Sequence, residues 1–205
     1  MGSGDLRQRK GKNVWAYSIR THESILASYD GSIEPEWPLL SPLFEFYVLH
    51  SPAEGQSALG IKIEEYGWSP DAWRDDLQKR LDSILTSEKR RMLALPSRQS
   101  KAGLARLFAD YDLGDGPLAN LHVERAVVRP ECDSYCYLRL FRHVRNCLAH
   151  GRFVVVEGEG VSGPIMIMED KDKYSITARM VLRVETLYKW RNIILGGPDV
   201  EWQLK

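Results

Sequence analysis

Residues 130–150 constrain the fold most, because they read as one helix with two contrasting sides. Apolar and aromatic residues recur at helical spacing on one side, a stripe suited to packing against a core. The opposite side gathers cysteines and histidines. The first set is Tyr137, Phe141, Val144 and Leu148, and the second is Cys136, His143, Cys147 and His150. We expect the chain's own core to cover the first side and a partner subunit or a site to cover the second. Gly151 can take the left-handed position that ends a helix.

A positive patch accompanies this helix in a chain with no net charge. The 28 basic and 28 acidic residues exclude the global charge of a non-specific nucleic-acid binder. Residues 134–156, however, contain no Asp or Glu. Their positive or titratable residues are Arg139, Arg142, Arg145, Arg152, His143 and His150. Arginine forks suit phosphate oxygens, so we expect this segment to bind substrate phosphates. The alternative is pairing of these arginines with carboxylates of other helices, such as Asp71, Asp75 or Asp110.

The same segment offers the groups that RNA cleavage without a metal requires: a base, an acid and a cation for the charged transition state. His150 can act as acid or base near neutral pH. Arg145 is always charged and suits the stabilising role. Asn146 lies four residues before His150 and can orient the imidazole or the substrate. Two copies of the chain supply both an acid and a base, so a symmetric dimer through this helix is expected.

The end of the helix carries the string Arg145-Asn146-Cys147-Leu148-Ala149-His150-Gly151. It resembles the R-x4–6-H signature of the HEPN superfamily, and the resemblance is strongest over residues 69–195. The hairpin and helix expected after it are similar to a plasmid-encoded bacterial branch of that superfamily. The resemblance implies a helical bundle in which two motifs meet at a dimer interface. It also implies cleavage of RNA to 2′,3′-cyclic phosphate ends with no metal or cofactor, by Arg145, Asn146 and His150.

Members of this superfamily include toxins and anti-phage effectors, so the resemblance implies such a role and an antitoxin or regulatory protein as a partner. Members silenced by tyrosine AMPylation carry a Tyr two residues past the motif histidine. Arg152 stands there in this chain, so that form of silencing is not implied.

Three other interpretations stay open. The domain can be a catalytically inactive HEPN-like module that binds RNA, a nucleotide or a protein. His143, Cys147 and His150 can contribute to a zinc site, since they share one helix side. Cys147 can be a nucleophile beside His143. Outside this helix, Trp37 and Trp68 lie in expected loops and are candidates for stacking on bases.

The remaining sequence predicts a mainly α protein with a small antiparallel β-hairpin or meander after the motif helix, and the resemblance implies that its helices form a HEPN-like bundle. Residues 1–12 are predicted to be a disordered basic tail and residues 13–205 one domain. No resemblance covers residues before 69, and residues 117–130 have no clear assignment. No apolar run approaches a membrane span, so a cytoplasmic protein is expected. The predicted elements are helices over 42–50, 69–95, 98–112, 130–150 and 179–194, and strands within 153–177.

Overall fold

The computed structural model describes residues 24–29, 36–53, 57–86, 93–94, 101–129, 136–157 and 163–200. The predicted basic tail lies outside these residues. The α-helices of the described part are α1 (Trp37–Phe44), α2 (Asp76–Thr86), α3 (Lys101–Asp110), α4 (Cys136–Ala149) and α5 (Val184–Gly196). Its strands are β1 (Leu93–Ala94), β2 (Arg125–Val128), β3 (Phe153–Glu157), β4 (Pro164–Lys171) and β5 (Ile176–Arg183). Short helical turns are η1 (Ile25–Ser28), η2 (Glu45–Leu49, a π-turn), η3 (Ile63–Tyr66) and η4 (Pro70–Arg74).

The strands form one sheet in the order β1-β2-β5-β4-β3. Strands β3, β4 and β5 are an antiparallel meander directly after α4. The sequence predicts β3 and β4 but assigns most of β5 to the helix expected over 179–194. Strand β2, from far earlier in the chain, extends the meander by pairing antiparallel with β5. The two-residue β1 pairs parallel with β2 at the edge. The sheet therefore joins segments on both sides of the motif helix.

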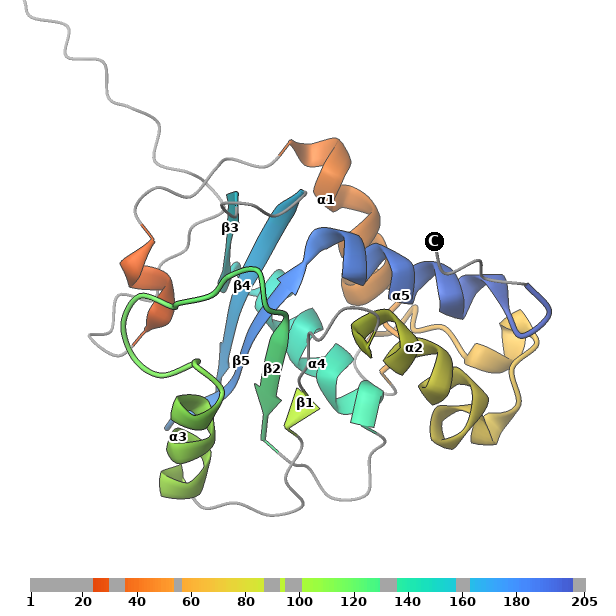
Figure 1. Ribbon diagram of the computed structural model, residues 1–205. Helices are drawn as coiled ribbons and strands as arrows, with labels where there is room; N and C mark the ends of the chain where they lie inside the picture. The colour runs from red at the N-terminus through yellow and green to blue at the C-terminus, as the bar shows by residue number, and fades with distance from the viewer. Residues whose placement is uncertain are drawn as a thin grey trace, which may run out of the picture.

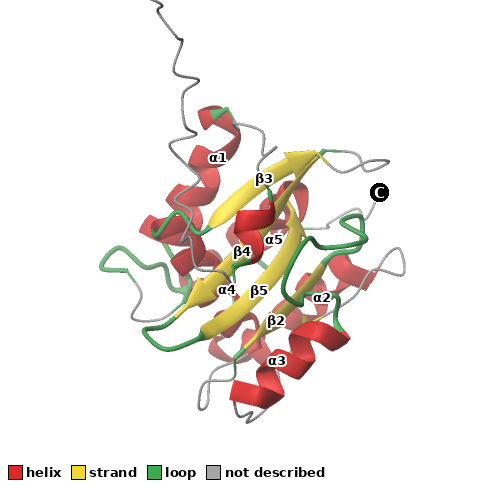
Figure 2. Cartoon of the chain, turned by 90° about the vertical axis from the view of Figure 1, so that its left-hand side faces the viewer, coloured by secondary structure: helices red, strands yellow, loops and turns green. Residues whose placement is uncertain are grey.

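Helices cover both faces of this sheet. Figure 1 shows α1, α2, α4 and α5 on one side and α3 on the other, and Figure 2 shows α3 in front of the strands. Alternate residues of each strand face the two sides: Met166 and Met168 belong to the core under α4, whereas Ile165 and Ile167 belong to the core under α3. The first core also contains the aromatic side of α4, packed against η2 and α5.

The prediction of a mainly α, HEPN-like bundle is wrong, because the chain is a mixed α/β protein. The burial of the sheet on both faces explains the error. The six inner residues of β5 are all buried, so this strand lacks the alternation that distinguishes a half-exposed strand from a helix, and the sequence predicts most of it as a helix. The predicted hairpin is thus only part of a larger sheet.

Several element boundaries are corrected for related reasons. The helix expected over 69–95 divides at Asp75, whose backbone is not helical, into η4 and α2. Residues 93–94 form β1 instead, since they pair with β2. The helix expected over 179–194 begins only at Val184, after β5. Strand β2 lies in the segment without a sequence assignment.

At the amino-terminal end, α1 starts at Trp37, before the start of the helix expected over 42–50, and contains Pro42. Helix α3 agrees with the helix expected over 98–112. No helix among the described residues is long and apolar enough to cross a membrane.

Candidate functional site

Helix α4 ends in a Schellman motif built on Gly151. Its φ angle of 61° is left-handed, as predicted. The Gly151 amide donates to the Leu148 carbonyl at 3.2 Å, and the Arg152 amide donates to the Cys147 carbonyl at 2.8 Å. This turn leads straight into β3 and puts Arg152 beside the helix end.

The sheet of the same chain covers the middle of the Cys/His side of α4. His143 is only 3% exposed and Cys147 is fully buried, both on the side that faces β4. Burial of the second side is therefore partial, because Cys136 is half-buried and His150 is exposed. At His143 and Cys147, however, the cover is the chain's own sheet, so these two residues are not available to a partner subunit.

Asp170, near the end of β4, gathers the polar groups of this buried layer. Its Oδ2 accepts from His143 Nδ1 at 2.8 Å and from Asn146 Nδ2 at 3.1 Å. Its Oδ1 accepts from Arg152 Nη1 at 3.2 Å and from the Lys171 amide at 2.9 Å. One carboxylate thus holds three of the side chains that the sequence singles out.

These contacts set the ionisation of Asp170. Burial by itself raises the pKa of the carboxyl, but the hydrogen bonds from His143 and Asn146 and the interactions with the charges of His143 and Arg152 outweigh it. The net pKa of Asp170 therefore lies below its ordinary value, and the group is ionised at neutral pH. Because an ionised carboxylate only accepts, His143 Nδ1 is the donor in their hydrogen bond. The other ring nitrogen of His143, Nε2, is buried and has no hydrogen-bond partner in the described part of the chain.

Arg145 is connected to Asp170 through Asn146. Arg145 Nη1 donates to Asn146 Oδ1 at 3.2 Å, while the amide nitrogen of Asn146 donates to Asp170. The Asn146 side chain is therefore fixed at both ends. This two-step connection restricts the guanidinium of the predicted catalytic arginine.

One side of α4 remains accessible, and it is basic. Seven residues of this side and of the turn after the helix are half-buried or exposed: Leu138, Arg139, Arg142, Arg145, Asn146, Ala149 and His150. No acidic residue occurs in the helix. His150 is exposed in the turn, and its backbone amide donates to the Asn146 carbonyl at 3.0 Å. The structure thus puts Arg139, Arg142, Arg145 and His150 on one accessible surface, which we call the arginine face, and buries His143 beneath it.

Two of the carboxylates considered as partners of these arginines lie next to other basic residues. Asp75 pairs with Lys79, and Asp110 lies 3.9 Å from Arg106. Asp71 is exposed at the start of η4. Asp170 lies 3.2 Å from Arg152 and is an acid that binds one of the predicted site residues.

The structure also bears on the other interpretations, which involve Cys147, a zinc site and two tryptophans. Burial raises the pKa of the Cys147 thiol well above its usual value, which keeps it protonated and opposes the nucleophile interpretation. Among the described residues, no group of three His, Cys, Asp or Glu side chains is arranged to hold a metal ion. Trp68 is buried and donates to the Ile194 carbonyl at 2.9 Å, so it is a core residue, whereas Trp37 is half exposed.

Asp170 is the residue that sequence reasoning missed. It lies two positions after the apolar run Ile165–Met168, and a pair of carboxylates at the end of such a run was the available signal. Its neighbour Glu169 points to the opposite face of the sheet, where it accepts from Arg179 Nε at 3.1 Å. Neighbouring residues of a strand face opposite sides of the sheet, so Glu169 and Asp170 face different cores. Which of the two acids faces α4 is known only once the position of β4 in the sheet is known.

No family model, curated protein or solved structure matches this chain.

Proposed function

We propose that this protein is a metal-independent endoribonuclease that binds RNA on the arginine face of α4. The observation that carries the proposal is the connection from Asp170 through Asn146 to Arg145. It restricts an arginine on an accessible helix side that has no acidic residue and that ends at the exposed His150. Electrostatic stabilisation by groups held in place before reaction is an efficient way to favour a charged transition state.

The proposed reaction is attack of the ribose 2′-oxygen on the neighbouring phosphorus. A neutral histidine takes the 2′-hydroxyl proton while the new O–P bond forms. The bond from phosphorus to the 5′-oxygen breaks, and a protonated histidine gives that oxygen a proton. Arg145 stabilises the negative charge on the phosphorane oxygens. The products are a 2′,3′-cyclic phosphate and a free 5′-hydroxyl, with no net gain or loss of protons.

One His150 per chain supplies an acid or a base, so the proposal includes a homodimer that pairs two motif helices. Since the sheet covers His143 and Cys147, the second copy would meet the arginine face near its carboxyl end. Repulsion between the two arginine faces would favour assembly around RNA phosphates. A cellular role as a toxin or anti-phage effector, restrained by an antitoxin or regulatory protein, is part of the same proposal.

The test is incubation of the purified protein with a mixed RNA ladder in excess EDTA. The comparison is between wild type, His150→Ala and the matched control His122→Ala, which removes an exposed histidine outside the motif helix. Wild type and the control should cleave RNA and leave cyclic phosphate ends. His150→Ala should lose at least about 100-fold in rate, the usual contribution of a general acid or base.

Two results would contradict the proposal. Cleavage by His150→Ala at the wild-type rate would remove His150 from the reaction. Salt-dependent RNA binding by all three folded proteins without any cleavage would instead identify a binding module that lacks catalysis.

A further inference from the structure

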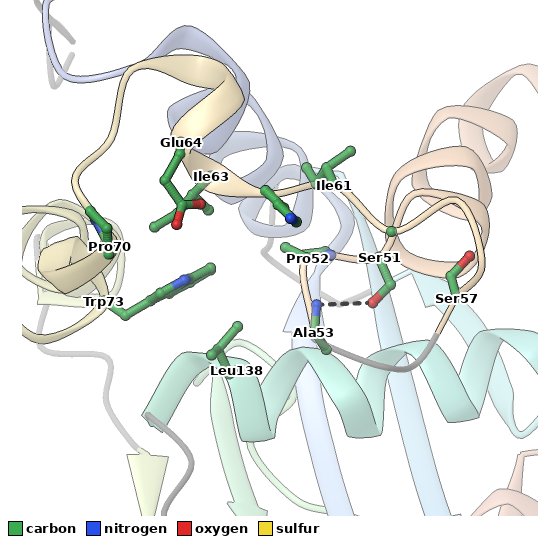
Figure 3. Close-up of a pocket in the computed structure, with 12 residues that line it drawn as sticks. Ser51, Pro52, Ala53, Ser57, Ile61, Ile63, Glu64, Pro70, Trp73 and Leu138 are labelled. Atoms are coloured by element: carbon green, nitrogen blue, oxygen red, sulfur yellow. Dashed lines mark hydrogen bonds between the residues drawn. The ribbon is translucent and has the colours of Figure 1, made fainter.

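A cavity opens beside the amino-terminal half of α4, away from the motif. Its volume is about 450 Å³, and it is bounded by the loop after η2, by η3, by η4 and by Leu138 of α4. Cavities that hold small ligands usually measure about 300–1,000 Å³. Figure 3 shows Trp73 extending between Pro70 and Leu138, with the carboxyl group of Glu64 directed toward the same space.

The cavity is lined by the indole ring of Trp73 and, at its mouth, by charged side chains. Trp73 is 6% exposed. Trp68 and Trp190 donate their indole hydrogens to backbone carbonyls, whereas Trp73 Nε1 donates to no group that the structure describes. Glu64 and Lys62 line the mouth, and neither forms an ion pair with another described residue. The nearby serine hydroxyls are already used in turns, as with Ser51, whose Oγ accepts from the Ala53 amide at 3.3 Å (Figure 3).

The cavity adjoins the arginine face. Leu138 lines it and lies on the same side of α4 as Arg142 and Arg145, four and seven residues further on. At 1.5 Å per residue these arginines stand about 6 Å and about 10 Å along the helix axis from Leu138. A single strand whose phosphates follow the two arginines toward the start of α4 therefore reaches Leu138, which lines the cavity.

We propose that this cavity binds one unpaired nucleobase of the RNA strand that lies along the arginine face. The proposal rests on the proposed function, since it names the part of the RNA that the same surface selects. The base packs against Trp73, as aromatic rings commonly bind unpaired bases. The Glu64 carboxylate accepts from an exocyclic amino group, as acidic side chains do with cytosine. Adenine, cytosine and guanine carry such a group, and uracil does not, so the site disfavours uracil.

The test uses the cleavage-deficient His150→Ala protein and fluorescently labelled RNA hexamers. One hexamer is all uridine, and two others carry a single central adenosine or cytidine. Fluorescence anisotropy should show about fivefold tighter binding of the adenosine or cytidine hexamer, as one hydrogen bond to a charged group near solvent would give. Adding Glu64→Gln should abolish that preference. Adding Glu65→Gln should keep it, because Glu65 is the next residue of η3 and does not line the cavity.

A second variant fills the cavity rather than changing its charge. Leu138→Trp should weaken binding of all hexamers at constant salt dependence, since the phosphate contacts remain. A preference that survives both Glu64→Gln and a folded Leu138→Trp protein, or the absence of any preference, would overturn the inference.

The outcomes separate the two proposals. RNA cleavage by wild type with the same sites after Glu64→Gln would leave the ribonuclease proposal standing and refute the base site. A Glu64-dependent base preference in a protein that never cleaves RNA would support the base site and refute the ribonuclease proposal.

Discussion

Asp170 shows how much of the candidate site depends on one residue of another element. Its two oxygens accept from His143, Asn146, Arg152 and a backbone amide, and the side chain is only 5% exposed. A buried carboxylate is stable only when it is paired and hydrogen-bonded, and here its partners supply both. The same bonds that stabilise the charge also orient Asn146 and, through it, Arg145.

Asp170→Asn should therefore destabilise the protein and slow the proposed reaction. The amide keeps the shape of the side chain but leaves the half-buried Arg152 without its countercharge. The loss should be on the order of 3 kcal/mol in the free energy of unfolding, measured with urea at pH 7. The control Asp110→Asn removes an exposed acid 3.9 Å from Arg106 and should change stability by less than about 0.5 kcal/mol.

The stability difference between wild type and Asp170→Asn should depend on pH in a defined direction. The folded pKa of Asp170 is lowered, so its stabilising effect is fully present above about pH 4 and disappears as the pH falls through the lowered pKa. The stability difference between wild type and Asp170→Asn should shrink on acidification below pH 4. In cleavage assays kcat should fall more than KM rises, as expected for a positioning residue. Equal stability of the two proteins at pH 7 would contradict this account.

At the scale of elements, the carboxyl end of α4 is where sequence and structure agree best. Gly151 adopts a left-handed conformation, and both hydrogen bonds of the terminating turn are formed. The turn sets the position of the exposed His150 and of Arg152 at once. It thereby joins the accessible part of the motif to the buried Asp170 cluster.

Gly151→Ala should cost about 1 kcal/mol, because a Cβ atom is strained at positive φ. For a chain of this size that lowers the melting temperature by about 2–4 °C, measured by circular dichroism. Gly114→Ala is the matched control, since its φ is not positive and its added Cβ would meet no atom closer than 3.8 Å. Equal melting temperatures for Gly151→Ala and Gly114→Ala would show that a Cβ atom at position 151 does not strain the turn.

The other elements show which features a sequence can predict. Helix α3 and the two-sided α4 follow from local periodicity, and strands β3 and β4 follow from β-branched and apolar runs. Strands β1 and β2 owe their existence to pairing with distant partners, so no local pattern predicts them. The link between Asn146 and Asp170 depends on β4 packing under α4, and the cavity beside Leu138 depends on loops that meet only in the fold. The sequence could thus predict the candidate residues on one helix. It could not predict the residues of other elements that hold them in place.

At the scale of the whole molecule, the proposed dimer makes a quantitative prediction. If each reaction needs the histidines of two copies, mixed dimers of wild type and His150→Ala are inactive. After unfolding and refolding an equal mixture, only about a quarter of the dimers are wild type on both sides. Activity per total protein should fall to about a quarter of the wild-type value.

If each chain acted independently, the mixture would retain about half of the wild-type activity instead. That value would refute an active site shared between two copies. Sedimentation of wild type with a non-cleavable 2′-deoxy oligonucleotide supplies the control for assembly. The same mixing with His122→Ala should leave activity unchanged, because His122 lies outside the motif helix.

The position of Asp170 in the chain also has a consequence during translation. Asn146 and Asp170 are 24 residues apart, so a ribosome completes the motif helix before it reaches the strand that supports it. A nascent or prematurely terminated chain that ends before β4 carries Arg145 and His150 without the carboxylate that restricts them. Under the proposed function, the order of synthesis delays activity until the sheet is complete, which would limit damage to the host's own RNA by unfinished copies.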